Sequence, residues 1–242
     1  MSVPAPLLEH ARTAWRPDTA RGPGRPDGSR LAGTPWISEG ESHPACPHCG
    51  RPLQLFLQLD TADLPPALEG AFGDGLIQLF YCVTDDPQCD VECGAWEPFA
   101  DSVVARLMPR GPGGLGLEAE GWAPHQILGW HALEDVPNTE EAETTLDVDL
   151  TDEEREQAWA SDVPHTGDKL AGWPAWIQGV EYPSCPQCGS RMRLVFQLDS
   201  GDFALALEGG CHIPYSFGDA GIAHLTQCPK HHDMLAFGWA CG

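Results

Sequence analysis

The feature of this sequence that most constrains the fold is a repeated stretch. Residues 45–60 read ACPHCGRPLQLFLQLD, and residues 184–199, which lie 139 positions later, read SCPQCGSRMRLVFQLD. Eight of the sixteen aligned positions are identical, which is more than chance gives over so short a stretch. We interpret the match as an internal duplication, so the chain should contain two copies of one structural unit.

The similarity between the two copies extends on both sides of this stretch. SRLAGTPWI (29–37) and DKLAGWPAWIQ (168–178) precede it, and FGDGLIQLFYC (72–82) and FGDAGIAHLTQC (217–228) follow it. Leucines alternate with mostly polar residues over 53–60, and the second copy repeats the pattern, which predicts a strand with one buried face in each copy. The sequence therefore predicts a mostly β (α+β) fold, a tandem duplication of a β-rich unit that carries a zinc-ribbon-like CPxCG site in each copy.

The two copies divide the chain into four predicted segments. Residues 1–29 are rich in Arg and Pro and show no periodicity, so we expect a flexible arm. The first β-rich repeat spans 30–110, an acidic bridge spans 111–167, and the second β-rich repeat spans 168–242.

The bridge should contain one strand and one short helix. HQILGWHAL (125–133) has the composition of a strand. TDEEREQAWA (151–160) should be a helix, because Thr151 can cap its N-terminus and Glu154 stands at the capping-box position. From Glu134 to Glu156 the bridge has eleven acids and one base.

The ten cysteines indicate metal binding rather than disulfides. Four of them form two C-x2-C pairs, and the start of the chain lacks the apolar core of a signal peptide; this combination favours metal. The sequence has no run of about 18 apolar residues, the length that a transmembrane helix needs. We therefore expect a cytoplasmic protein.

Two structural zinc sites are predicted, one in each copy. In Cys-Pro-x-Cys-Gly two thiolates grip one metal from a tight turn, which makes half of a tetrahedral zinc site. The first site would combine Cys46 and Cys49 with Cys82 and either Cys89 or Cys93. The second would combine Cys185 and Cys188 with Cys228 and His231, with His232 as the rival ligand. Four protein ligands close a site, so both Zn²⁺ ions should be structural and no catalytic residue is assigned.

The sequence offers little support for an enzyme. It contains no G-x-S-x-G, P-loop or H-E-x-x-H motif. No histidine or cysteine has Glu two residues later, which excludes the signature of the zinc deaminases.

The charge is strongly and unevenly acidic. The chain has 36 acids and 13 bases, a formal net charge of −23. Residues 1–30 carry five Arg and three acids, a net of +2, so the remainder carries −25. Such a surface repels nucleic acid and anionic membranes and attracts basic proteins.

These residues together resemble a known family. Lys-Leu-Ala-Gly-Trp-Pro-x-Trp-Ile-Gln, Cys-Pro-x-Cys-Gly, Phe-Gln-Leu-Asp, Gly-Asp-Ala-Gly and Cys-Pro-x-His resemble the YwqG-like bacterial proteins of unknown function. The first copy is also similar to the N-terminal part of eukaryotic programmed cell death protein 2, and the two groups form one duplicated superfamily. The resemblance covers about 29–110 and 168–242, and it favours Cys89 over Cys93.

The resemblance implies no established enzymatic activity. It implies a chaperone for a basic ribosomal protein among the eukaryotic members and toxin-neutralising immunity proteins among the bacterial ones. Our leading hypothesis is therefore a non-enzymatic, zinc-stabilised module that binds a basic protein partner, a toxin or ribosomal-type client, and neither nucleic acid nor membrane. Its candidate contacts are the acidic bridge, Trp130, Trp173 and Trp176, although core packing is the commoner role of tryptophan.

Two alternatives remain open at this point. One is an uncharacterised metal-dependent hydrolase that uses the second site with His231 or His232 free. The other is nucleic-acid binding through the Arg-rich arm, against which the acidic remainder of the chain argues. The sequence does not indicate the oligomeric state.

Overall fold

The computed structural model describes residues 2–85, 88–161, 163–200 and 211–242, and within these ranges the regular structure is mostly β. The helices are α1 (Ala5–Leu8), α2 (Cys89–Glu92), α3 (Thr139–Thr145) and α4 (Asp152–Ala160), with short 3-10 turns at Thr61–Asp63 and Pro66–Leu68. The strands are β1 (Arg12–Arg21), β2 (Arg30–Leu31), β3 (Trp36–Ser38), β4 (Gln54–Asp60), β5 (Leu76–Tyr81), β6 (Val103–Met108), β7 (Gly113–Leu115), β8 (His125–Asp135), β9 (Lys169–Ala171), β10 (Arg193–Asp199), β11 (Ile222–Gln227) and β12 (Leu235–Ala240).

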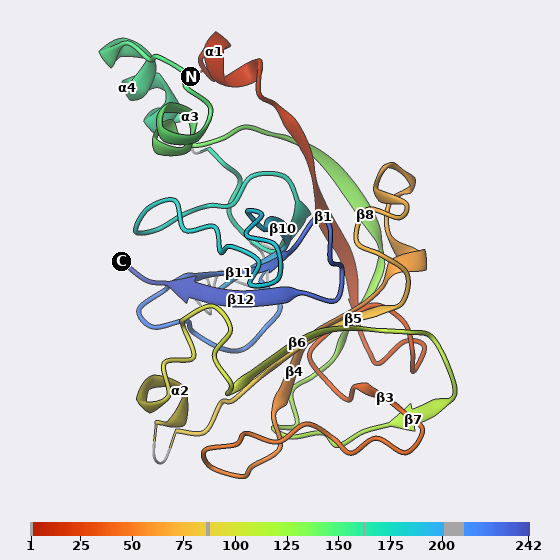
Figure 1. Ribbon diagram of the computed structural model, residues 1–242. Helices are drawn as coiled ribbons and strands as arrows, with labels where there is room; N and C mark the ends of the chain where they lie inside the picture. The colour runs from red at the N-terminus through yellow and green to blue at the C-terminus, as the bar shows by residue number, and fades with distance from the viewer. Residues whose placement is uncertain (1, 86–87, 162, 201–210) are drawn as a thin grey trace.

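Ten of these strands form one curled antiparallel sheet (Figure 1). Their order is β12-β11-β10-β9-β1-β8-β2-β4-β5-β6. The two end strands, β12 and β6, contact each other, and Trp239 Nε1 donates a hydrogen bond to the Tyr81 hydroxyl at 2.8 Å. The sheet is therefore nearly closed, with a small second sheet of β3 and β7 beside it.

An aromatic core fills the inside of the curled sheet. Phe56 lies 5.1 Å from Tyr81 and 5.9 Å from Phe217 between ring centroids, and Phe237 lies 5.9 Å from Phe217. These four rings come from β4, β5, β12 and the loop before β11, so strands from both ends of the chain bury one common core.

The strand β4 differs from the prediction of one buried face, because all seven of its residues are buried. A register shift lies between Leu55 and Leu57. Leu53 and Leu55 pack with the cysteines of the first copy, whereas Leu57 and Leu59 join the aromatic core. The bulge moves the leucines from one cluster to the other, which simple period-two alternation does not anticipate.

The polar residues of this strand are buried because they hold the backbone of neighbouring segments. In each half one glutamine accepts a hydrogen bond from a backbone amide and donates one to a carbonyl. The pairs are Trp36 N (2.9 Å) and Gly28 O (2.9 Å) for Gln58, and Ala175 N (2.8 Å) and Gly167 O (2.9 Å) for Gln197. Each partner in the second half lies 139 positions after its counterpart, so the two halves have the same local structure here.

The N-terminal segment differs from the predicted flexible arm. Arg12 to Arg21 form the central strand β1, which pairs along its length with β8 and at Ala14 and Trp15 with β9. Its arginines are mostly exposed, while Ala14 and Pro17 are buried. The sequence hides this strand because its hydrogen-bonding partner lies more than a hundred residues away, and because Pro within a strand argues against that assignment.

A small projecting lobe stands at one end of the sheet, where α1, α3 and α4 gather (Figure 1). Its apolar cluster consists of Leu7, Val136, Ala142, Leu150 and Ala158. The helix α4 occupies the span expected from the sequence, with the side chain of Thr151 and that of Glu154 forming the capping box. No helix in the described part of the chain is long and apolar enough to cross a membrane.

Candidate metal centres

The two Cys-Pro-x-Cys-Gly turns have the same backbone geometry. Each begins and ends at a β-bridge, Ala45 with Pro52 and Ser184 with Arg191. The turn hydrogen bonds are Cys46 N to Arg51 O (2.9 Å) and Gly50 N to Cys46 O (2.8 Å), and Cys185 N to Ser190 O (2.9 Å) and Gly189 N to Cys185 O (2.8 Å). Gly50 and Gly189 have φ of 71° and 67°, a conformation that glycine adopts without strain. The sequence therefore fixes both turns locally.

The first copy brings four cysteine sulfurs together. Cys46 Sγ lies 3.6 Å from Cys89 Sγ, and Cys49 Sγ lies 3.7 Å from Cys82 Sγ. All four ligand atoms lie within 4.8 Å of one another. Cys93 lies outside this group, and its thiol donates a hydrogen bond to the Cys89 carbonyl. The turn before β4, the end of β5 and the start of α2 thus converge on one point.

The second copy brings together three cysteines and one histidine. Cys188 Sγ lies 3.7 Å from Cys228 Sγ, and His231 Nδ1 lies 3.8 Å from both Cys185 Sγ and Cys228 Sγ. These four ligand atoms also lie within 4.8 Å of one another. His232 lies outside the group, and its backbone carbonyl accepts a hydrogen bond from Gln227 at 2.7 Å.

The geometry fits a tetrahedral metal ion in both groups. Four thiolates bound to zinc at about 2.3 Å lie about 3.8 Å from one another, close to the distances of 3.6 to 3.8 Å found here. The backbone amides of Lys230 and His231 also point at Cys228 Sγ, each at 3.4 Å. Such amides stabilise a thiolate, as the amides of a metal-binding turn do.

The first group holds thiols of very different acidity. Burial opposes ionisation of Cys49, but hydrogen bonds from Thr84, the Arg51 amide and its cysteine neighbours outweigh it and lower the pKa of Cys49 to about 6. Burial raises the pKa of Cys82 to about 11, and burial together with neighbouring cysteines raises the pKa of Cys89 further. Neighbouring thiolates repel one another, so the thiols of one group do not all ionise together. A bound divalent cation would offset this repulsion and allow all of them to ionise.

The second group repeats this division. Hydrogen bonds from the side chain and the amide of Ser190 lower the pKa of Cys188 to about 6. Burial raises the pKa of Cys185, and its cysteine neighbours add to the effect. Each copy therefore places one acidic thiol, the second cysteine of its turn, beside at least one thiol whose pKa burial raises: Cys82 and Cys89 in the first copy and Cys185 in the second.

The sequence also matches a known protein family. A family profile described as "Domain of unknown function (DUF1963)" matches residues 29–231. The chain belongs to the DUF1963 family. The matched range includes all eight residues of the two groups and excludes β1 and β12.

A curated relative is similar over part of its length. The uncharacterized protein YpfL of Salmonella typhimurium is 28% identical over 159 residues, which are 65% of this chain and 32% of that relative. The chain therefore spans about a third of the length of this relative.

The tryptophans proposed as contacts occupy different environments. Trp173 is 2% exposed, and its indole donates a hydrogen bond to the His10 carbonyl at 3.0 Å. Trp130 and Trp176 are half-buried, and Trp176 donates to the carboxylate of Glu141 at 2.9 Å. The prominent exposed tryptophan is Trp159 on α4, at 89%, which the sequence reasoning missed because a helix position reveals exposure only once its neighbours are known.

One part of the acidic bridge is not a solvated surface. The side chain of Glu141 is buried, and burial raises its pKa while the indole of Trp176 and the charge of Arg191 oppose the shift. Asp135 is also buried, and it pairs with the buried Lys169 at 2.8 Å. These two acids lie inside the fold and are not available for a partner.

A hydrogen-bonded chain of three side chains lies elsewhere on the sheet. Thr19 Oγ1 lies 2.9 Å from His212 Nε2, and His212 Nδ1 lies 2.8 Å from Asp168 Oδ2. Asp168 also accepts hydrogen bonds from the amides of Asp199 (3.0 Å) and His212 (2.9 Å). Through these hydrogen bonds, Asp168 holds the loop at His212 against the sheet.

Proposed function

We propose that this chain is a non-enzymatic protein-binding module, stabilised by two zinc ions, that takes a basic protein as its partner. The observation that carries the proposal is the exposed face of α4. Trp159 is 89% exposed on a helix whose other exposed residues include Asp152, Glu153 and Glu156. An exposed tryptophan among acids suits a partner that presents Lys or Arg, because the ring attracts cations and the acids attract the same charge.

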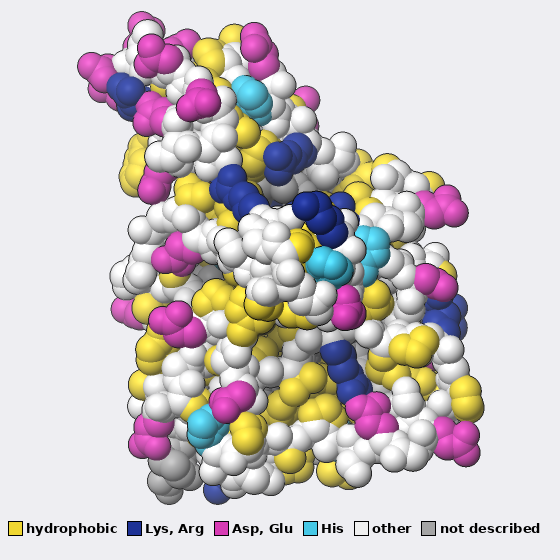
Figure 2. Space-filling model, in the orientation of Figure 1, with side chains coloured by type: hydrophobic (Ala, Val, Ile, Leu, Met, Phe, Trp, Pro, Cys, Tyr) yellow, Lys and Arg dark blue, Asp and Glu magenta, His cyan; other side chains and the backbone are white. Residues whose placement is uncertain are grey.

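The position of α4 supports this role. It lies on the projecting lobe at one end of the curled sheet (Figure 1), and acidic side chains gather on that end of the molecule (Figure 2). Arg155 is engaged by Glu143 and Asp152, both at 2.8 Å. The remaining acids of the exposed face give it a negative field that would steer a basic partner to Trp159.

Zinc is the metal that the two donor sets favour. A set of four cysteines and a set of three cysteines with one histidine, at tetrahedral spacing, are typical of structural zinc. Four protein donors leave no open coordination position for water, which supports a structural role for both ions and argues against the metal-dependent hydrolase. In each half the ion would link the turn that precedes one strand to the end of the neighbouring strand, β4 to β5 and β10 to β11.

We further propose that the two halves arose by tandem duplication, as in the YwqG-like family and its relative programmed cell death protein 2. The support is the constant offset of 139 positions in the turns, in the strands that follow them and in the glutamine hydrogen bonds. That family's chaperone and immunity roles both involve the capture of another protein, in keeping with the acidic α4 surface.

The test compares what the full chain binds with what two α4 variants bind. We expect cross-linked partners of wild type to be basic, with isoelectric points above about 9, and to be lost with Trp159→Ala. The triple variant Asp152→Asn, Glu153→Gln and Glu156→Gln should slow association without unfolding, since exposed charges contribute little to stability.

Leu128→Ala is the matched control, because Leu128 is another exposed apolar side chain, at 61%, on β8. It should leave binding unchanged. Raising the salt from about 50 to 500 mM should slow association, because the Debye length falls well below 10 Å. Partners that are acidic, or that bind Trp159→Ala as well as wild type, would contradict the proposal.

A hydrolase is the second candidate, and the chain Thr19–His212–Asp168 favours it. Its order matches nucleophile, base and orienting acid, and burial raises the pKa of Asp168. It ranks second because none of these residues lines the cavities found at Trp96, Tyr182 and Trp130. Turnover of an ester or peptide substrate that Thr19→Val abolishes would establish it.

A further inference from the structure

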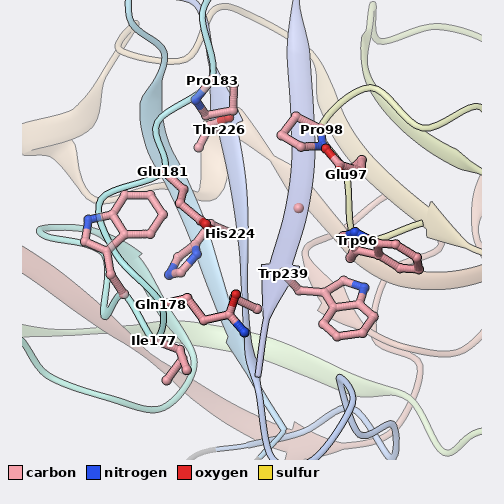
Figure 3. A pocket seen from close by; sticks show the side chains of 13 residues that line it. Trp96, Glu97, Pro98, Ile177, Gln178, Glu181, Pro183, His224, Thr226 and Trp239 are labelled. Atoms are coloured by element: carbon pink, nitrogen blue, oxygen red, sulfur yellow. The ribbon is translucent and has the colours of Figure 1, made fainter. Parts of the chain in front are cut away.

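A cavity of about 350 Å³ lies over the sheet of the second half. One wall carries Trp176 and Glu181 from the segment that leads to the second Cys-Pro-x-Cys-Gly turn, and the other carries Trp96 from the loop after α2. His224 of β11 and Gly238 of β12 form its floor. Figure 3 shows Glu181 and His224 on one side and Trp96 on the other. Pockets that bind small ligands have volumes of about 300 Å³ or more. This cavity lies at the lower end of that range, so its volume suits one long side chain.

The first half shows what fills the corresponding place. In the register of the sheet, Gln78 pairs with Arg106 on β6 as His224 pairs with Gly238 on β12. The neighbours across the next strand also correspond, since Gln58 pairs with Gln78 and Gln197 pairs with His224. Gly238 therefore stands where the first half has Arg106.

The guanidinium of Arg106 occupies that place in the first half. It donates two hydrogen bonds to Gln78 Oε1, from Nε at 3.0 Å and from Nη2 at 2.8 Å. It also forms an ion pair with Glu41 and lies 5.4 Å from the ring of Phe80. An acceptor, a carboxylate and an aromatic face thus surround one guanidinium.

The second half keeps these three kinds of group but has no cation among them. Glu181 stands four residues before Cys185, as Glu41 stands five residues before Cys46. Aromatic faces come from tryptophans, and among the described residues that line the cavity there is neither Lys nor Arg. Gly238 adds no side chain to the cavity, although a Cβ there would meet the Trp96 carbonyl at 3.0 Å, and Glu97 and Glu181 make the lining acidic.

His224 supplies a ring nitrogen that has no hydrogen-bond partner among the described residues. It is 7% exposed, and its Nε2 makes no hydrogen bond within the described residues. Burial, together with the charge of Lys169, lowers the pKa of His224 to about 3. Its ring is therefore neutral at physiological pH, and it packs 4.6 Å from Trp176.

We infer that this cavity accepts an arginine side chain of the partner, which takes the place that Arg106 fills in the first half. A guanidinium stacks on tryptophan and bonds to a carboxylate through a planar fork, which an ammonium does not match. The inference rests on the proposed function for the source of the arginine, while the nature of the site rests on the comparison of the two halves.

The first experiment titrates the full chain with N-acetyl-arginine methylamide and follows tryptophan fluorescence. The citrulline counterpart keeps the shape of the probe and removes its charge, so we expect it to bind at least about tenfold more weakly. The lysine counterpart should also bind more weakly than the arginine probe. Equal binding of the arginine and citrulline probes would overturn the inference.

The second experiment fills the cavity from within. Gly238→Arg should abolish probe binding, because its own guanidinium would occupy the site. Gly238→Ala is the matched control, since both variants place a Cβ 3.0 Å from the Trp96 carbonyl and share any shift it causes, yet alanine leaves the cavity open. Binding of the probe to Gly238→Arg as tight as to Gly238→Ala would overturn the inference.

A surface variant keeps the test valid if Gly238→Arg fails to fold. Glu181 is exposed, so Glu181→Gln should fold and weaken the arginine probe about tenfold. Glu156→Gln, with the same charge change on α4, should leave the probe affinity unchanged. A probe that binds while no basic protein does would refute the proposed function alone, whereas a probe that fails to bind refutes the cavity alone.

Discussion

Replacing Cys188 with serine separates metal binding from packing. Cys188 is exposed, although its Sγ lies 3.7 Å from that of Cys228. An exposed cysteine that binds nothing should tolerate serine with a change of less than about 0.5 kcal/mol in the free energy of unfolding. A cysteine that binds zinc should not.

The expected loss follows from the loop that the metal closes. Forty positions separate Cys188 from Cys228, and closing a loop of that length in the unfolded chain corresponds to about 3–4 kcal/mol. The apolar cluster around this group is small, consisting of Cys185, Met192, Cys228 and Ala236, so packing does little to replace the metal. We expect Cys188→Ser to destabilise the protein by about 3 kcal/mol.

Urea unfolding with and without a zinc chelator measures this loss, and zinc content is measured in parallel. Wild type should contain two zinc ions per chain and Cys188→Ser one, and the chelator should narrow the difference in stability between them. Cys93→Ser is the control, because Cys93 lies beside the first group but outside it, and it should retain both ions. The reasoning is refuted if Cys188→Ser is as stable as wild type and the chelator affects neither protein.

Two further predictions concern the paired halves and pH. Gln197→Leu leaves the Ala175 amide and the Gly167 carbonyl unpaired, at about 1–3 kcal/mol per group, so urea unfolding should show a loss of roughly 2–6 kcal/mol. Gln58→Leu removes the acceptor of the Trp36 amide, whereas the Gly28 carbonyl keeps the Arg30 Nε donor at 3.4 Å, so its loss should be about 1–3 kcal/mol. A loss below about 1 kcal/mol in either would contradict the shared hydrogen-bond scheme. Zinc affinity, measured against a competing chelator, should weaken as pH falls, and most steeply below about pH 6. The pKa values of Cys49 and Cys188 are about 6, so below that pH the metal must also displace protons from these two thiols. An affinity independent of pH would exclude thiolate ligands.

Features that depend on neighbouring residues were predictable from the sequence. The two Cys-Pro-x-Cys-Gly turns need only Pro, Gly and local hydrogen bonds, and α4 needs only its capping box at Thr151 and Glu154. The strands β4 and β10 follow from short-range alternation, although the alternation did not reveal that both faces are buried.

Features that depend on distant partners were not predictable. The strand β1 has exposed arginines and an internal proline, and only its pairing with β8 makes it a central strand. The burial of Glu141 depends on Trp176 and Arg191, which come from a segment more than thirty residues later. The cavity at Gly238 is visible only when β11 and β12 are in register and the first half shows an arginine in the same place.

The order of residues alone predicted the eight residues of the two candidate metal groups, their spacing in the two halves and the acidic composition of the chain. It left two choices open, between Cys89 and Cys93 and between His231 and His232, and the structure brings Cys89 and His231 into the two groups. These choices needed the folded chain, because residues one to four positions apart have similar spacing in sequence but point in different directions once a helix or turn is formed. The same reason explains why the exposure of Trp159 and the cavity at Gly238 could be recognised only in the folded structure. The sequence determines which side chains are present, and tertiary packing determines which of them are in contact.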